Sequence, residues 1–447
     1  MSGDPLHEPL TAHPPAALRP SACPGLLRIV AALDGGICRV KLAGGVLRAE
    51  QAEAVAAAAE RYASGVIEAT NRANLQIRGV GPDAEALIAG LLAAGLGPRN
   101  AGADDVRNVL LSPSAGIDPQ QLFDTRTLAA EVLASLEQNS HLHGLSAKFA
   151  LQLDGGEGLA MLEHHHDLWL SPQRVSGQVR LAFGLAGCPA GARALGSVTL
   201  AQGHNLVLAV LERFLALAGP EESRMRHLLA RLPGGAEAFV AGLGLPIEPI
   251  ELHRQPALTP VLGIHNQSAP NLTFVAAQAP LGRLTPAMLR GVAALARQFG
   301  DSTVRMTPWQ GVLLANIAQA DALAVQDGLR ALGLLVSTDE PLARLVACTG
   351  AAGCAKGLAD TKADAQALAL LLGPGAVAQS VHLTGCKRSC ACAHVAPATL
   401  LATAPGCYDL YVRDPAQPGF GRLCARYLSL DAAAAWLGDC SRSDTHD

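Results

Sequence analysis

Two closely spaced pairs of cysteines lie near the carboxyl end of the chain, Cys348 with Cys354 and Cys386 with Cys390. Five residues separate the first pair and three the second, and the first gap contains only Thr, Gly and Ala. Four thiolates in such pairs can bind a [4Fe–4S] cluster, because small intervening residues let the loop close around it. Zinc is the alternative, but structural zinc sites prefer two intervening residues within each pair. The spacing therefore predicts one iron–sulfur cluster on these four cysteines.

Further metal-binding residue types lie beside this motif and in a second group. Cys392 and His394 follow Cys390 at two and four residues and could bind an additional iron, since thiolate and imidazole both suit that metal. The segment EHHHD at 163–167 contains the donors of a two-histidine, one-carboxylate iron site. The alternatives are packing beside the cluster for the first group and a solvated polar turn for the second. We assign no task to five other cysteines, Cys23, Cys188, Cys407, Cys424 and Cys440.

The composition describes a chain with a large apolar core and no strongly charged surface. Half of the 447 residues are hydrophobic, and the formal net charge is -4. We therefore expect roughly two to four domains and no broad nucleic-acid-binding surface. No uninterrupted apolar run is long enough to cross a bilayer, and the amino end lacks the pattern of a secretory signal. These features predict a cytoplasmic protein whose eleven cysteines are free for metal binding or catalysis rather than paired as disulfides.

Two segments, about 240 residues apart, share the order strand, turn, Ala- and Leu-rich helix, strand. With Gly45 aligned to Gly282, Thr70 falls on Thr307 without a gap. A constant offset over this length predicts an internal duplication and hence a pseudo-twofold α+β protein. The expected organisation is a flexible extension at 1–24, a half-domain at 25–98, an α+β domain at 99–243, a second half-domain at 244–328 and an iron–sulfur-binding α+β domain at 329–440.

The cysteine spacing resembles the cluster motif of the sirohaem-containing sulfite and nitrite reductases. That family also has an arginine before a glycine-rich turn, a T-x-R segment, an R-N-V motif and a lysine, in this order. The matching residues here are Arg39, Arg72, Arg107 and Lys148, so the resemblance covers about residues 25–430. It implies duplicated ferredoxin-like half-domains with two cluster- and tetrapyrrole-binding α+β domains. The four cations would then bind tetrapyrrole carboxylates, although each taken singly is typical of an ordinary surface cation.

The two copies differ at the positions expected to bind anions. In the second copy, Trp309 stands in place of Arg72, and Arg305 stands in place of Glu68. The second half thus lacks one of the arginines that would bind tetrapyrrole carboxylates. We therefore expect the first half to bind most of the carboxylates, while the second half mainly shapes the cavity.

Two departures from the reductases favour one branch of that family. The second of the family's paired lysines is replaced by Ala150, and the third cluster cysteine is followed by KRSCACAH rather than by the P-N-G-C form. Both changes affect the catalytic face. The segments 21–45 and 347–369 resemble the precorrin-3B synthases, which are similar in length and lack sirohaem.

This resemblance implies an oxygen-dependent hydroxylation of precorrin-3A at C20, followed by closure of a γ-lactone by the ring A acetate, in aerobic cobalamin (vitamin B12) biosynthesis. It implies a [4Fe–4S] cluster, a mononuclear non-haem iron and an external electron donor. The donor is expected to be NAD(P)H acting through a reductase, because the chain has no G-x-G-x-x-G strand-turn-helix motif. The alternatives are a sirohaem-dependent sulfite or nitrite reductase and a non-catalytic tetrapyrrole carrier or electron-transfer subunit. We expect no nucleic-acid or membrane partner.

Overall fold

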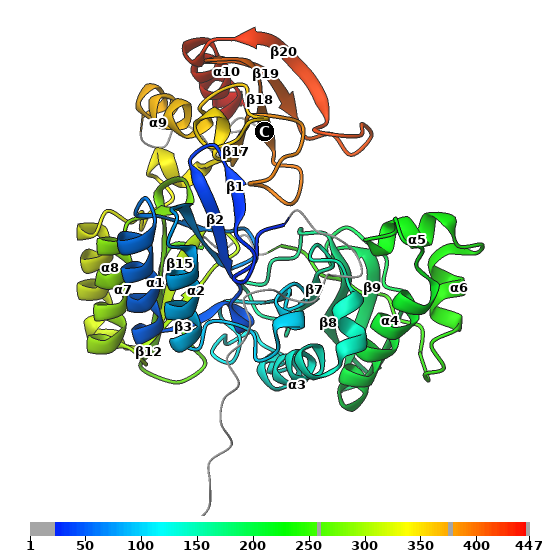
Figure 1. Ribbon diagram of the computed structural model, residues 1–447. Helices are drawn as coiled ribbons and strands as arrows, with labels where there is room; N and C mark the ends of the chain where they lie inside the picture. Colours follow the sequence, from blue (N-terminus) through cyan, green and yellow to red (C-terminus); the bar gives the residue numbers. More distant parts are fainter. Residues whose placement is uncertain (1–22, 257–260, 374–378, 444–447) are drawn as a thin grey trace, which may run out of the picture.

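The computed structural model describes residues 23–256, 261–373 and 379–443. Apart from its last two residues, the expected extension at 1–24 lies outside this part of the chain. The described strands form four sheets of five strands each (Figure 1). Within the described ranges, none of the helices is both long and apolar enough to cross a membrane.

Two of the sheets belong to a pair of similar α+β units. The first unit consists of β1 (Val30–Ala32), β2 (Gly35–Val40), β3 (Val46–Arg48), α1 (Ala49–Tyr62), β4 (Val66–Ala69), β5 (Leu75–Val80) and α2 (Ala84–Ala93). The second consists of β11 (Gly263–Asn266), β12 (Leu272–Gln278), β13 (Arg283–Leu284), α7 (Pro286–Phe299), β14 (Thr303–Met306), β15 (Gly311–Ala318) and α8 (Ala322–Ala331). The four helices lie side by side (Figure 1).

The register of the strands confirms the internal duplication. Each unit contributes one short strand to the sheet of the other, so the sheets run β1-β2-β5-β4-β13 and β11-β12-β15-β14-β3. Arg283 pairs with Glu68 in the first sheet, and Val46 pairs with Arg305 in the second. The offsets 283 − 46 and 305 − 68 both equal 237, and α1 and α7 begin and end at the same offset. The expected pseudo-twofold arrangement therefore extends to single residues.

The turn before the exchanged strand requires a left-handed backbone in both copies. Gly45 has φ 75° and its counterpart Gly282 has φ 74°. A Cβ atom at either position would also lie only 3.0 Å from a neighbouring atom. Glycine is suited to this conformation because it has no side chain to clash. The repeated glycine determines where the chain leaves each unit and enters the sheet of the other unit.

Helices α1 and α7 join the two units through one hydrophobic core. Alanines on α1, among them Ala52, Ala56 and Ala59, are fully buried beside Val292 and Ala296 of α7. Small side chains let two helices approach closely, and alanine has the highest helix propensity. The two units therefore share a single core, which holds the sheets in a fixed relation.

The other two sheets each begin with three parallel strands, as pairing of β6 with β7 and β16 with β17 shows. One contains β6 (Val109–Leu111), β7 (Leu151–Leu153), β8 (His166–Val175), β9 (Gln178–Gly187) and β10 (Gly196–Thr199), with α3 (Thr125–Gln138), α4 (Gly203–Leu217), α5 (Met225–Arg231) and α6 (Gly235–Ala241). The other contains β16 (Leu345–Ala347), β17 (Val381–Thr384), β18 (Ala398–Ala404), β19 (Cys407–Val412) and β20 (Arg422–Leu428), with α9 (Thr361–Leu372) and α10 (Leu430–Ser443).

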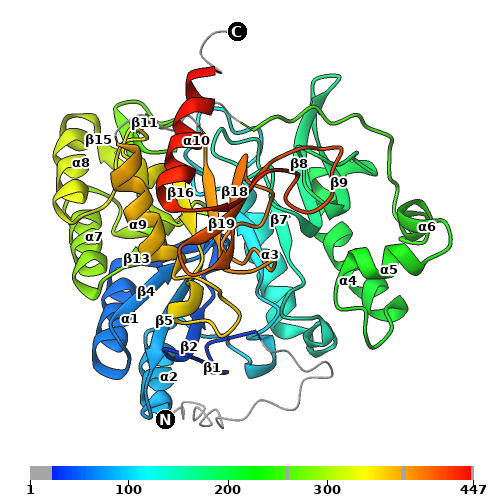
Figure 2. The same ribbon diagram turned by 90° about the horizontal axis from the view of Figure 1, so that it is seen from above.

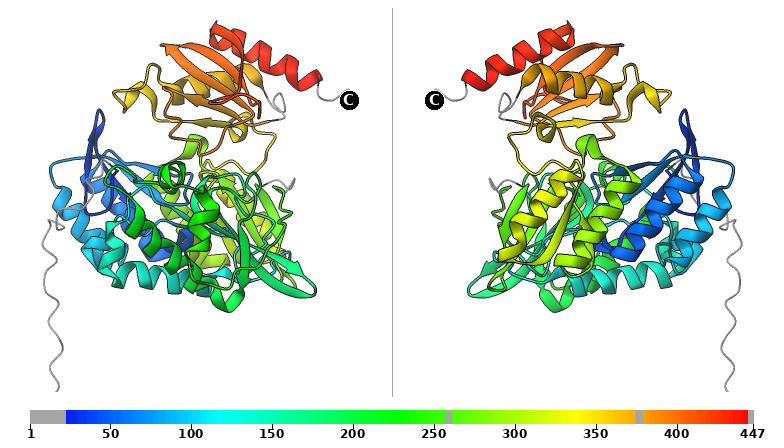
Figure 3. Two further views of the ribbon diagram at one scale, coloured as in Figure 1. Left: turned by 90° about the vertical axis from the view of Figure 1, so that its right-hand side faces the viewer. Right: turned by 90° about the vertical axis from the view of Figure 1, so that its left-hand side faces the viewer.

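The sheet that starts with β16 forms a lobe above the rest of the molecule (Figure 3). Seen from above, this lobe lies between the helices of the paired units and the domain that contains α4 to α6 (Figure 2). Ligands of open α/β sheets commonly bind beyond the carboxyl ends of parallel strands. The loops that follow β16 and β17 are therefore the first place to look for a functional site.

Candidate functional site

The two cysteine pairs meet at one edge of the β16–β20 sheet. Cys348 directly follows β16, and Cys386 lies two residues beyond β17, which runs parallel to β16. The Gly385 amide donates a hydrogen bond to Cys348 Sγ at 3.3 Å. Burial raises the pKa of Cys390, and the other three cysteines of the motif add to this effect by repulsion. The structure therefore brings all four predicted cluster cysteines into one neighbourhood.

Glycines make the loops around these cysteines compact. A Cβ atom on Gly350 would lie 2.4 Å from the Ala359 carbonyl oxygen, and one on Gly357 would lie 2.6 Å from the Ala351 amide nitrogen. In the described parts of the chain, no three His, Cys, Asp or Glu side chains are placed to bind a single metal ion. A cube-shaped cluster needs a wider arrangement, because each thiolate binds a different iron. Four converging thiols in tight loops fit such a cluster better than they fit zinc.

Two of the four predicted cations, Arg39 and Arg72, lie close together at the edge of the first half-domain. Arg39 is on β2, and Arg72 lies in the turn between β4 and β5. Burial lowers the pKa of Arg72 to about 10, and repulsion from Arg224 and Arg39 contributes. The negative charge of Asp167 acts against this lowering, and Nε of Arg39 is buried without a hydrogen-bond partner among the described residues. Two half-buried arginines that repel each other are suited to binding an anionic ligand.

The other two predicted cations differ from this pair. Arg107 already interacts with the protein, because Nη1 lies 3.5 Å from Glu137 Oε1 and donates to the Gly97 carbonyl at 3.3 Å. Its Nε and Nη2 atoms are buried and have no partner in the described structure. Lys148 is exposed and lies three residues before β7. The structure thus groups Arg39 with Arg72 and places Lys148 at the surface.

A small cavity of about 10 Å³ adjoins Arg72 and is lined by residues of both the first half-domain and the β6–β10 domain. It has room for about one water molecule. Binding of a tetrapyrrole here would therefore require the surrounding segments to move apart. Ala150, which replaces the family's second lysine, faces this cavity. The cavity is lined by Arg72, Asn74, Asn108, Val109, Leu110, Ala150, Leu151 and His166.

The structure joins the two additional metal-site candidates into one group. The rings of His164 and His394 lie 5.1 Å apart between centroids, and Nε2 of His394 is 3.9 Å from Glu163 Oε2. Nδ1 of each ring is buried and has no hydrogen-bond partner among the described residues. His164 and His166 are buried, so the segment 163–167 is not a solvated turn. Burial raises the pKa of Cys392, which lies near the same group, to about 11.

Several residues near this site were not identified from the sequence. Asn71 donates from Nδ2 to the carbonyl oxygens of Cys390 at 3.3 Å and Ala391 at 3.2 Å, so it connects the arginine turn to the last cluster cysteine. Arg224 pairs with the buried Asp167 at 2.9 Å. Sequence spacing gives no signal for these contacts. The T-N-R order placed Asn71 beside Arg72, which was the only available hint.

Comparison with known proteins agrees with this arrangement. The model of the nitrite/sulfite reductase ferredoxin-like half domain matches residues 32–94 and 265–332. The model of the nitrite and sulphite reductase 4Fe-4S domain matches residues 102–248, whereas the four cysteines lie after residue 347. The two half-domain matches coincide with the two duplicated units, and the expected reductase-like α+β fold is confirmed.

Individual relatives differ in the activity that their names give. The chloroplastic ferredoxin–nitrite reductase of Zea mays is 32% identical over 387 residues, which cover 80% of this chain and 68% of the relative. The precorrin-3B synthase of Sinorhizobium sp is 27% identical over 412 residues, which cover 90% of this chain and 84% of the relative.

A solved structure shows the same fold at low sequence identity. The Mycobacterium tuberculosis NirA protein superposes with a TM-score of 0.75 at 20% identity, covering 91% of this chain and 80% of that one. The family model of a 4Fe-4S domain supports an iron–sulfur cluster in this chain. The duplicated half-domains, the converging cysteines and these matches together show that the chain belongs to the nitrite/sulfite reductase family.

Proposed function

We propose that this chain is a precorrin-3B synthase, an iron–sulfur monooxygenase that hydroxylates precorrin-3A at C20 with γ-lactone formation in aerobic cobalamin biosynthesis. The observation that carries this proposal is Ala150, an apolar residue on the cavity wall where the resemblance to the reductases predicts a lysine. Without that lysine, the cavity wall lacks the additional ammonium group that the resemblance to the reductases predicts for binding and protonating a small oxyanion substrate. The Sinorhizobium relative supports the proposal, because the match covers most of both chains.

In this proposal, the half-buried arginines bind the carboxylates of the macrocycle. One nitrogen atom of Arg39 and two of Arg107 are buried without a hydrogen-bond partner among the described residues, and burial together with neighbouring arginines disfavours the charge of Arg72. Arginine can form two parallel hydrogen bonds to a carboxylate, which fixes orientation as well as affinity. Lys148 would add a mobile positive charge at the surface of the same region. The substrate would thus be held by its side chains while its meso carbon faces the cavity.

The proposed cofactors are a [4Fe–4S] cluster on the four cysteines and a mononuclear iron. The cluster would supply electrons from an external donor, for which we propose NAD(P)H acting through a reductase. His164, His394 and Glu163 lie near one another, but no three such donors of the described residues are placed to bind one metal ion, so these side chains would have to move together to hold a mononuclear iron. The proposal places the reaction in the cytoplasm, where cysteines stay reduced.

A sirohaem-dependent nitrite or sulfite reductase is the second candidate. It is favoured by the higher identity to the maize reductase, whose name specifies ferredoxin as the electron donor. Sirohaem also carries eight carboxylates, so the same arginines suit it equally well. A non-catalytic tetrapyrrole carrier would need the same cations but no electron donor.

Absorption spectra and oxygen uptake distinguish these candidates. Protein purified without oxygen should show a broad iron–sulfur absorption with no haem bands, and it should consume dioxygen only when precorrin-3A and a reductant are present. Sirohaem bands together with nitrite or sulfite reduction would establish the second candidate. Tetrapyrrole binding with neither reaction would establish the carrier.

A further inference from the structure

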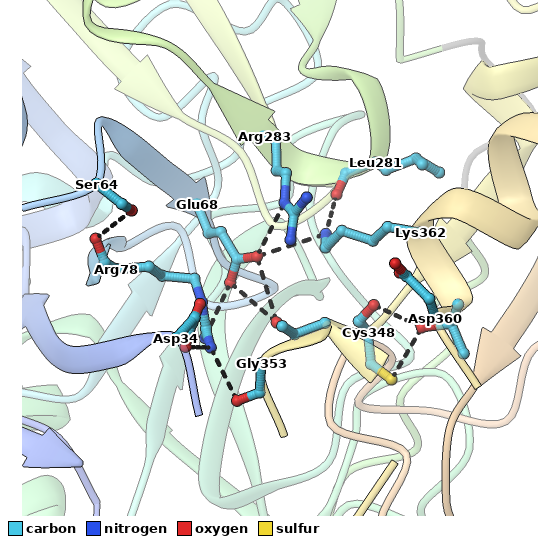
Figure 4. Close-up of polar contacts among 12 residues, drawn as sticks. Asp34, Ser64, Glu68, Arg78, Leu281, Arg283, Cys348, Gly353, Asp360 and Lys362 are labelled. Carbon is cyan, nitrogen blue, oxygen red and sulfur yellow. Dashed lines mark hydrogen bonds and ion pairs between the residues drawn. The ribbon is translucent and has the colours of Figure 1, made fainter. Parts of the chain in front are cut away.

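A buried cluster of charges lies between the two half-domains and the cysteine loop at 348–354 (Figure 4). Its central residue is Glu68 on β4, whose side chain is 12% exposed. Three cations surround it: Arg78 from β5, Arg283 from β13 and Lys362 from α9. This charge cluster therefore connects the first half-domain, the exchanged strand of the second half-domain and the domain that carries the cysteines.

The distances within this charge cluster are those of direct ion pairs. From the Glu68 carboxylate, Arg78 Nη1 lies at 3.6 Å, Arg283 Nε at 3.5 Å and Lys362 Nζ at 3.7 Å. Arg78 also pairs with Asp34 at 2.8 Å. Three cations face two carboxylates, so one positive charge is in excess. The side chains of Arg78 and Lys362 are only 5% and 6% exposed, so solvent screens them weakly.

The same groups contact both ends of the cysteine loop. Thr349, next to Cys348, donates a hydrogen bond from Oγ1 to Glu68 at 3.3 Å. Arg78 donates from Nη2 to the carbonyl oxygen of Gly353, the residue before Cys354, at 3.4 Å. Figure 4 shows these contacts converging on the loop. The charge cluster therefore fixes the two positions from which the first cysteine pair projects.

Lys362 is linked to Cys348 through the neighbouring residue. Thr361 donates from Oγ1 to the carbonyl oxygen of Cys348 at 2.7 Å and lies 3.4 Å from its Sγ atom. Burial lowers the pKa of Lys362, while the negative charges of Glu68 and Cys348 act in the opposite direction. A buried ammonium group thus lies within electrostatic reach of a predicted cluster ligand.

The duplicated unit offers an internal comparison for Glu68. Its counterpart Arg305 donates from Nη1 to the carbonyl oxygens of Pro113 and Ala115, both at 3.0 Å. These carbonyls belong to the loop after β6, which corresponds to the cysteine loop after β16. Glu68 and Arg305 thus hold equivalent loops in the two halves of the protein, but the two side chains carry opposite charges. Tethering alone does not require a carboxylate with three cations, so the charges on the cysteine side call for an additional explanation.

We propose that Glu68, Arg78, Arg283 and Lys362 are positioning residues that set the reduction potential of the iron–sulfur cluster. Reduction adds one negative charge to the cluster, so nearby cations favour the reduced state and a nearby carboxylate opposes it. The net positive charge raises the potential, and Glu68 limits this increase while it holds the loop. This inference rests on the cysteine-bound cluster of the proposed function, but not on the identity of the substrate.

The experiment is a potentiometric titration of the full chain, followed by electron paramagnetic resonance of the reduced cluster. Glu68→Gln removes a negative charge and should raise the midpoint potential, whereas Lys362→Met removes a positive charge and should lower it. We expect the ratio of reduced to oxidised cluster at a fixed ambient potential to change about threefold to tenfold in each direction. A tenfold change corresponds to about 59 mV for a one-electron couple.

Two further variants keep the test decisive. Arg283→Gln alters a cation whose side chain is already 40% exposed, so it should fold and lower the potential by a smaller amount. Glu60→Gln removes a carboxylate from the exposed Arg290 pair and should leave the potential unchanged. Shifts of the same sign in the Glu68 and Lys362 variants, or no shift in any variant, would overturn the inference alone. If the wild-type chain gave no cluster signal, the cluster assignment and this inference would both be wrong.

Discussion

Replacing Arg72 by methionine should stabilise the ligand-free protein while weakening tetrapyrrole binding. Burial and neighbouring arginines lower the pKa of Arg72 from 12.5 to about 10. This difference corresponds to a cost of about 3 kcal/mol for the charged side chain, at about 1.4 kcal/mol for each pKa unit. Because part of the side chain reaches solvent, screening reduces this cost, and we expect a gain of about 1–3 kcal/mol in the free energy of unfolding.

The same substitution removes a charged partner for the carboxylates of the ligand. A hydrogen bond to a charged group contributes about 1.5–3 kcal/mol, so affinity for precorrin-3A or sirohaem should fall roughly tenfold to a hundredfold. Urea denaturation measures the first effect, and absorbance titration of the tetrapyrrole measures the second. The matched control is Arg224→Met, which removes the 2.9 Å ion pair of the buried Asp167 and should destabilise the protein by about 3 kcal/mol. Loss of stability in Arg72→Met, or unchanged ligand affinity, would refute the reasoning.

Three further predictions follow from single contacts. Asn71→Ala should speed the loss of cluster iron to a chelator, because the Cys390 carbonyl loses its 3.3 Å hydrogen bond; Asn139→Ala, a helix cap elsewhere, should leave that rate unchanged. Burial lowers the pKa of Lys41 from 10.5 to about 8, so between these pH values the unfolded chain binds more protons. The melting temperature should therefore rise with pH across that interval, and the rise should be smaller in Lys41→Met. If the melting temperatures of the wild type and the variant changed with pH in parallel, the lowered pKa of Lys41 would be contradicted. Arg305→Gln should cost about 1–3 kcal/mol of stability, because it leaves two buried carbonyl groups unpaired. The variant should still bind the tetrapyrrole. If a folded variant did not bind it, the expected asymmetry of the two halves would be wrong.

The duplication could be predicted because it is written in residue spacing. The offset that aligns Gly45 with Gly282 also aligns the paired residues of the exchanged strands. Glycine at a left-handed position is needed wherever the same turn occurs, so the sequence retains it in both copies. The exchange of strands itself was not predicted, because β3 and β13 are too short to carry a pattern of their own.

The site was predictable only where its residues are close in sequence or share a family motif. The cysteine pairs lie in short loops, and the parallel pairing of β16 with β17 brings the pairs together. By contrast, the contact of His164 with His394 joins residues that are 230 positions apart in the sequence, and it depends on how two domains pack. Glu68 aligned with an arginine in the second copy, but only the structure shows what that difference of charge contacts.

Isotope labelling of the reaction product tests the proposed function most directly. The purified chain would be incubated with precorrin-3A, a reductant and isotopically heavy dioxygen, and the tetrapyrrole product would be analysed by mass spectrometry. The proposed monooxygenase activity predicts a product that carries one atom of the heavy isotope, with none incorporated from labelled water at the meso carbon. Unchanged precorrin-3A, in a preparation that reduces nitrite or sulfite and contains sirohaem, would contradict the proposal.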